Sequence, residues 1–222
     1  MSPQETGEKH NLVIVQAFPA NSTLTQGAIR YLEEFFFFFF IDLPGCYSFA
    51  QPLDDISLDN YVKFLEDKIE SLNLNSYILS GISFGFLVIN KVKTDNRCLF
   101  IFAIEPYLGY KYITLSIGKR IAIYVVSTLL SIDDFISKVW HKGWFRNLMC
   151  RLMDKTKAVI NVVIREMDPG TLIETSKLVL WYNKKLTFQD KPYVLLLNPR
   201  CNLIKFDKTL YEFVDNIPNQ QL

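Results

Sequence analysis

The stretch LSGISFGFL, residues 79–87, places Ser83 midway between Gly81 and Gly85, with an apolar run before and after it. With 9 glycines and 13 serines in 222 residues, chance would produce roughly 0.02 such Gly-x-Ser-x-Gly matches. A strand on one side and a helix on the other would form a sharp turn that lifts the serine hydroxyl above a sheet. The motif alone leaves two interpretations open: a nucleophile on a turn, or a small polar residue between two packed elements.

Composition excludes several classes of function. The 24 lysines and arginines nearly balance the 23 aspartates and glutamates, so a nucleic-acid partner is not expected. Only two histidines are present and the four cysteines, Cys46, Cys98, Cys150 and Cys201, are widely spaced, so we expect reduced thiols and no metal site. No glycine-rich phosphate loop or dinucleotide fingerprint occurs, and no cofactor is expected.

The polar start of the sequence, MSPQETGEKHN, predicts a cytoplasmic protein. Two charge-free apolar stretches, residues 35–41 and 121–132, are shorter than the roughly 20 residues that a membrane-spanning helix needs. No membrane span is therefore expected, although an interfacial role for the second stretch stays open.

Short apolar runs alternate with helical patterns along most of the chain. Strands are expected at 11–16, 35–42, 77–79, 98–104 and 193–197, and helices at 22–34, 58–72, 84–92 and 206–214. This alternation predicts an α/β fold, a mostly parallel sheet with helices on both faces and a ligand site at the carboxyl ends of the strands. The six phenylalanines at 35–40 fit a fully covered central strand better than a low-complexity tract, because helix and turn signals flank them.

Residues 108–186 break the alternation. They are mostly helical, with expected breaks at Gly118, Gly143 and Pro169-Gly170, and they are too long for a simple crossover. The chain is therefore expected to be one domain, with a core formed by 1–107 and 187–222 and an inserted helical lid at 108–186.

Four segments, taken in order, resemble the α/β-hydrolase family: QAFPA at 16–20, IDLPG at 41–45, GISFG at 81–85 and VLLLNPRCNLI at 194–204. The resemblance implies an α/β-hydrolase fold with an inserted lid and with Ser83 as the nucleophile. It also implies an oxyanion hole formed by the backbone amides of Phe84 and Phe18. Ala17 stands where members usually have glycine, which affects the loop that presents Phe18.

The same resemblance leaves the base and the acid open. Members usually carry an aspartate about where Asn202 stands, and Glu105 occupies a second position from which some members supply the acid. The histidine that usually follows the last strand has no counterpart, because the sequence stops after the helix expected at 206–214. His141, in KVWHKGW, is interpreted as a surface or packing residue, and His10 as solvent-exposed.

The implied activity is hydrolysis of a small to medium ester, thioester or related acyl substrate through an acyl-Ser83 intermediate. The alternative is a catalytically inactive hydrolase-like binding protein, or a truncated fragment without turnover. A missing last strand would expose a parallel sheet edge, which favours truncation. The expected partner is a small acyl substrate, and the oligomeric state stays open.

Two further interpretations concern residues outside the motif. Asp42 is expected to fix a loop by hydrogen bonds rather than to take part in chemistry. Trp140, Trp144 and Phe145 are expected to pack between lid and core, with an acyl-pocket lining as the alternative.

Overall fold

The computed structural model describes residues 9–48, 50–112, 114–131, 135–153, 155–184, 186–197 and 220–221. Its centre is a parallel sheet with the strand order β2-β1-β3-β4-β5-β6. The strands are β1 (His10–Val15), β2 (Phe36–Ile41), β3 (Tyr77–Ile82), β4 (Cys98–Ile104), β5 (Tyr193–Leu196) and β6 (Gln220–Gln221). The helices are α1 (Ser22–Ile29), α2 (Leu58–Ser71), α3 (Phe84–Ile89), α4 (Ile117–Leu130), α5 (Phe135–Val139), α6 (Gly143–Met153), α7 (Lys157–Glu166) and α8 (Pro169–Trp181), with short 3-10 turns η1 (Arg30–Leu32) and η2 (Tyr110–Tyr112).

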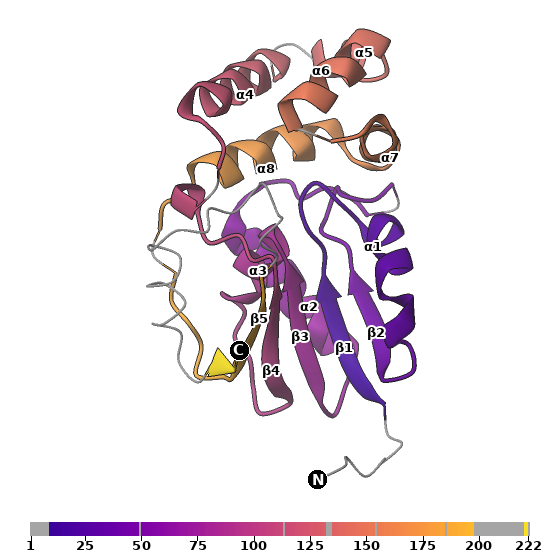
Figure 1. Ribbon diagram of the computed structural model, residues 1–222, viewed down its shortest axis with the longest axis vertical. Helices are drawn as coiled ribbons and strands as arrows, with labels where there is room; N and C mark the ends of the chain where they lie inside the picture. Colours follow the sequence, from indigo (N-terminus) through magenta and orange to yellow (C-terminus); the bar gives the residue numbers. More distant parts are fainter. Residues whose placement is uncertain are drawn as a thin grey trace.

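The expected fold class is confirmed: strands and helices alternate, and the sheet is parallel (Figure 1). Helices α2 and α3 lie behind the sheet, and α4 to α8 form a separate layer above the carboxyl ends of the strands. Because all the strands run in one direction, the loops that follow them meet at the edge beneath this layer.

Helix α2 begins and packs as its capping residue and its apolar spacing predict. Its N-cap Ser57 accepts a hydrogen bond from the backbone N–H of Asn60, which satisfies one of the free donors of the first turn. Its buried residues recur at helical spacing and face the sheet: Leu58, Tyr61, Leu65 and Ile69. Tyr61 also shares a 2.7 Å hydrogen bond with Thr175 of α8, which ties α2 to the helical layer.

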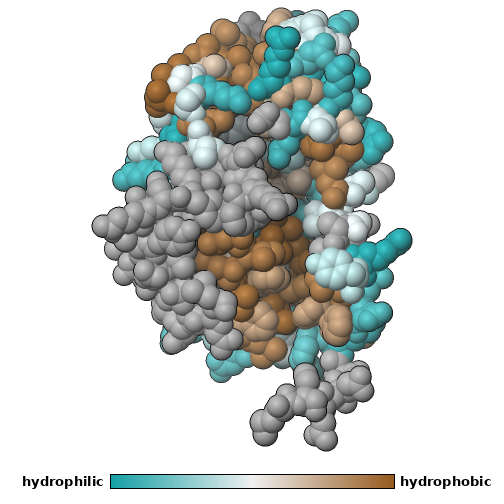
Figure 2. Space-filling view, in the orientation of Figure 1, coloured by the Kyte–Doolittle hydropathy of each residue, from teal (hydrophilic) through white to brown (hydrophobic). Residues whose placement is uncertain are grey.

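The phenylalanine run forms a strand, but the prediction of a fully covered central strand is wrong. Strand β2 is the outermost strand of the described sheet, and among the described residues its only partner strand is β1. Phe37 is 54 % exposed. Phe36, Phe38 and Phe40 are partly buried on the sheet face opposite α2 and α3, where Figure 2 shows apolar residues in the middle of the molecule.

At the other side of the sheet, the structure corrects the expectation that β5 would have no neighbouring strand. Residues 220–221 form β6, a two-residue strand that pairs in parallel with β5 through Tyr193 and Val194. The helix expected at 206–214 lies outside the described residues.

Two of the three helix breaks expected in the helical layer are present. Gly143 begins α6, and Pro169 begins α8 behind the N-cap Asp168, whose carboxylate accepts a 2.6 Å hydrogen bond from the N–H of Thr171. Gly118 does not break a helix, because it is the second residue of α4 and tolerates the helical backbone there.

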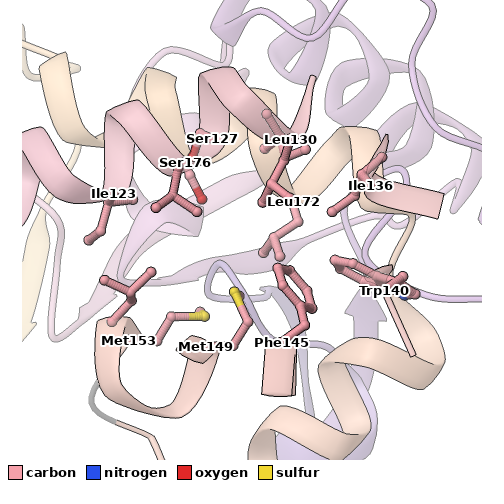
Figure 3. A pocket seen from close by; sticks show the side chains of 13 residues that line it. Ile123, Ser127, Leu130, Ile136, Trp140, Phe145, Met149, Met153, Leu172 and Ser176 are labelled. Atoms are coloured by element: carbon pink, nitrogen blue, oxygen red, sulfur yellow. The ribbon is translucent and has the colours of Figure 1, made fainter. Parts of the chain in front are cut away.

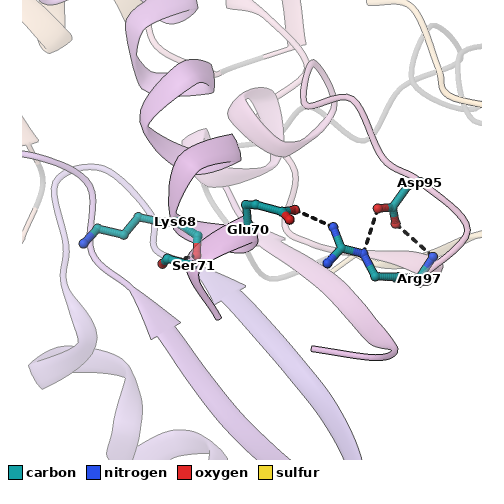
Figure 4. A network of polar contacts seen from close by, with 5 residues as sticks. All are labelled: Lys68, Glu70, Ser71, Asp95 and Arg97. Atoms are coloured by element: carbon teal, nitrogen blue, oxygen red, sulfur yellow. Dashed lines mark hydrogen bonds and ion pairs between the residues drawn. The ribbon is translucent and has the colours of Figure 1, made fainter. Parts of the chain in front are cut away.

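The amino ends of the strands lie at the far end from the helical layer, and a small polar network links them to α2 (Figure 4). Arg97, just before β4, binds Glu70 of α2 at 2.6 Å and Asp95 at 2.7 Å. Glu70 and Asp95 are exposed and Arg97 is partly exposed, so water screens these ion pairs and each adds little stability.

No helix within the described ranges has the length and apolar character needed to cross a membrane. Cys46, Cys98 and Cys150 are free thiols as expected, and Cys201 lies outside the described residues. Among the described residues, no group of three or more histidine, cysteine or acidic side chains is placed to hold a metal ion.

Candidate active site

Ser83 occupies a sharp turn between β3 and α3. Its backbone has φ +50° and ψ −114°, a conformation that costs free energy for a residue with a side chain. Three backbone hydrogen bonds of 3.0 Å hold it there: its N–H donates to Ile104, and its carbonyl accepts from Phe86 and Tyr107. The turn is therefore fixed from both β4 and α3.

The two glycines of the motif are required by close backbone contacts. A Cβ atom on Gly81 would lie 2.6 Å from the backbone N of Phe86, and one on Gly85 would lie 2.5 Å from the carbonyl oxygen of Val15. Neither approach is possible for a larger residue without moving the backbone. The glycine spacing therefore follows from the packing of α3 against β1 and β3.

A cavity of about 390 Å³ opens at this turn. Its walls come from the loop after β1, the Ser83 turn, the segment after β4 and the helical layer. Most lining residues are apolar, and the charged ones among the described residues are Glu105 and Lys155. The cavity lies at the carboxyl ends of the strands, where a ligand site was expected.

Three of the five predicted site residues, Ser83, Glu105 and Phe18, line this cavity. Phe84 is buried beside it, and its ring packs edge-on against that of Phe18 with centroids 6.0 Å apart. The N–H of Phe84 belongs to the first residue of α3 and so has no acceptor within the helix, as an oxyanion donor requires. Asn202 lies outside the described residues.

Among the lining residues that were not singled out from the sequence are Tyr107 and Lys155. Tyr107 follows β4, and its hydroxyl donates to the carbonyl of Val179 in α8. Burial raises the pKa of the Tyr107 phenol, so it stays protonated and acts as a donor. Lys155 reaches the cavity from the segment between α6 and α7. The positive φ of Glu105, +43°, is also a feature that sequence cannot reveal.

Neither histidine of the chain lines the cavity. His10 is exposed at the start of β1, at the amino ends of the strands, and His141 is exposed between α5 and α6. The interpretation of His10 as solvent-exposed and of His141 as a surface residue agrees with these positions.

Asp42 fixes a loop, as expected. Its carboxylate accepts 2.6 Å and 2.7 Å hydrogen bonds from the N–H and hydroxyl of Ser22, the first residue of α1. Because the N-cap Asn21 makes no capping bond with its own side chain, Asp42 takes that role from a neighbouring loop.

We expect Asp42→Ala to lower the free energy of unfolding by about 1–2 kcal/mol, because it leaves both Ser22 donors without this carboxylate. Urea unfolding followed by circular dichroism measures the change. Asp67→Ala, on the exposed side of α2, serves as the control and should change stability by less than about 0.5 kcal/mol. Equal effects of the two substitutions would contradict the capping role.

A second, smaller cavity of about 40 Å³ lies inside the helical layer (Figure 3). Trp140 and Phe145 are buried against it, and the indole N–H of Trp140 donates to the carbonyl of Ile164 at 2.8 Å. Trp144 is largely exposed. Trp140 and Phe145 therefore pack within the helical layer and do not line the Ser83 cavity.

Comparisons with known proteins identify the fold. No protein-family model and no curated protein matches the sequence. A hydrolase from Oleispira antarctica has a TM-score of 0.70 at 16% identity, covering 97% of this chain and 82% of its own. An esterase from Thermogutta terrifontis has a TM-score of 0.66 at 15% identity, with coverage of 97% and 80%. The bottromycin epimerase BotH has a TM-score of 0.66 at 14% identity, with coverage of 98% and 82%. This chain therefore has the α/β-hydrolase fold that its four sequence segments resemble.

Proposed function

We propose that this protein is a serine hydrolase that cleaves a small to medium ester, thioester or related acyl substrate through an acyl-Ser83 intermediate. The observation that carries the proposal is the strained Ser83 turn, which is fixed by three backbone hydrogen bonds and lines a mostly apolar cavity. The similarity to structures named hydrolase and esterase supports the general class.

In this proposal, the Ser83 oxygen bonds to the acyl carbon, and the alcohol or thiol leaves with the serine proton. Water then attacks the acyl carbon, the bond to the Ser83 oxygen breaks, the carboxylic acid is released, and the serine oxygen takes up a proton from that water. The N–H groups of Phe84 and Phe18 stabilise the oxyanion that forms on the way. Glu105 is the acidic residue that lines the cavity among those described, and we assign it the acid role. The apolar walls fit an apolar acyl or alcohol group, and residues 108–186 act as a lid that sets specificity.

One observation favours a second candidate function, which is acyl binding without turnover. Neither His10 nor His141 lines the cavity, so neither of them is placed to act as the histidine base of a serine triad with Ser83. The structural neighbour BotH is named an epimerase, so this fold is not restricted to hydrolysis.

A fluorophosphonate probe with intact-mass readout tests the nucleophile. The wild-type chain should gain one probe mass, and Ser83→Ala should gain none. Ser176→Ala is the matched control, because Ser176 lines the same cavity from α8 but is not on the turn, and it should be labelled as the wild type is. Labelling that persists in Ser83→Ala would remove Ser83 as the nucleophile.

Release of nitrophenol from a p-nitrophenyl butyrate substrate separates the two candidates. Continuous release that Ser83→Ala abolishes supports hydrolysis. A single stoichiometric release supports acylation without turnover, and no labelling and no release together support the binding function.

A further inference from the structure

The solvent-facing side of α4 is apolar along its whole length. Five of its residues are between 43 and 63 % exposed: Ile117, Ile121, Tyr124, Val125 and Leu129. The sequence carries no charge from 121 to 131. Figure 2 shows this surface as an apolar area at the upper left, over α4. The opposite side of the helix contributes Ile123 to the Ser83 cavity, so α4 has apolar residues on both sides.

Helix α2 has the same length of 14 residues and provides an internal comparison. Its exposed positions are mostly charged and include Asp59, Lys63, Asp67, Lys68 and Glu70. A helix whose outer side faces only water is expected to resemble α2. The apolar outer side of α4 therefore points to a partner.

Charge is distributed unevenly between the helical segment and the rest of the chain. Residues 108–186 hold 13 lysines and arginines and 6 aspartates and glutamates, which gives this segment a net charge of +7. The rest of the chain holds 11 lysines and arginines and 17 aspartates and glutamates, a net charge of −6. The acidic residues include Asp133 and Asp134, which lie outside the described ranges. Lys138 and Lys142, in and just after α5, are exposed, and α5 contacts α4 at the end of the molecule farthest from the strands' amino ends (Figure 1).

We propose that the exposed apolar side of α4, within a helical segment of net charge +7, docks on the surface of an anionic lipid bilayer. An apolar helix side in a helical segment of net positive charge is the combination that inserts shallowly at such a surface, with the cations of the segment drawn to the anionic head groups. A second copy of the chain fits less well, because two helical segments of net charge +7 would repel each other. The inference does not depend on hydrolysis at Ser83.

The test is sedimentation with vesicles. The full chain should bind vesicles of phosphatidylcholine mixed with phosphatidylglycerol, bind pure phosphatidylcholine vesicles far less, and lose binding as salt is raised. Ile121→Gln with Val125→Gln, which changes no charge, should weaken binding by ~10-fold or more. Both positions are exposed, so the double variant should keep the thermal unfolding midpoint of the wild type.

Phe37→Gln with Leu99→Gln is the matched control, because it removes two similarly exposed apolar residues from the sheet, and it should bind as the wild type does. The proposal is overturned if the α4 variant binds normally, if the control loses as much binding, or if neutral vesicles bind equally well. It is also overturned if the wild type ignores vesicles but forms a dimer that the α4 variant abolishes, since the partner is then a second copy.

Discussion

Gly85→Ala is expected to lower the free energy of unfolding by about 3 kcal/mol or more. The added Cβ would lie 2.5 Å from the carbonyl oxygen of Val15 and 2.6 Å from that of Gln16. Both contacts are with the backbone of β1 and of the loop after it, so no side-chain rotation relieves them. Helix α3 would have to move away from the sheet, which is the costly form of overpacking.

Gly118→Ala is the control for this experiment. Gly118 is also near the start of a helix, but a Cβ atom there meets nothing within 4 Å, so the substitution should leave stability unchanged or raise it by up to about 1 kcal/mol. Urea denaturation of both variants measures the difference. A Gly85→Ala variant as stable as the wild type would show that α3 does not pack against β1 as described.

Phe145→Ala is expected to cost about 3–5 kcal/mol, the range for removing a fully buried aromatic side chain. Phe145 is completely buried in α6, lies beside the 40 Å³ cavity, and packs against the ring of Trp140 with centroids 5.7 Å apart. Truncation would enlarge that cavity and remove the ring contacts that hold α6 to its neighbours (Figure 3).

The adjacent Trp144→Ala provides the comparison. Trp144 is 55 % exposed, and its ring meets Phe145 edge-on, so its truncation should cost about 1 kcal/mol. Chemical unfolding of the two variants under one condition gives the ranking. If the Trp144 variant were the less stable one, that result would contradict the placement of Phe145 on the buried side of α6 and of Trp144 on its exposed side.

The elements best predicted from sequence are those decided by nearby residues. Strand β4 has the expected bounds, and α2 begins after the expected cap, Ser57, because β-branched or aromatic runs and capping side chains act locally. The Ser83 turn was also predicted, because glycines two residues before and two residues after the serine indicate that neighbouring backbone segments pack closely there. The burial of β2 was not predictable in the same way, because a strand's place at the edge of a sheet depends on pairing between distant segments.

The same distinction applies to the site. Parallel topology brings Ser83, Glu105 and Phe18 to one edge of the sheet, so their meeting follows from the expected fold. Tyr107 and Lys155 could not be found this way, because the walls that they form depend on how the helical layer packs on the core. Asn202 stays a prediction.

The exposed outer strand β2 has one more consequence. A strand with a free side offers its N–H and C=O groups to any other chain, and Phe37 would give an incoming strand an apolar ring to cover. The ammonium group of Lys9 lies over that ring, 5.4 Å from its centroid, and donates to the carbonyl of Glu33 at 2.7 Å. An incoming strand that covered the Phe37 ring would have to displace this cation or desolvate it, which disfavours such pairing.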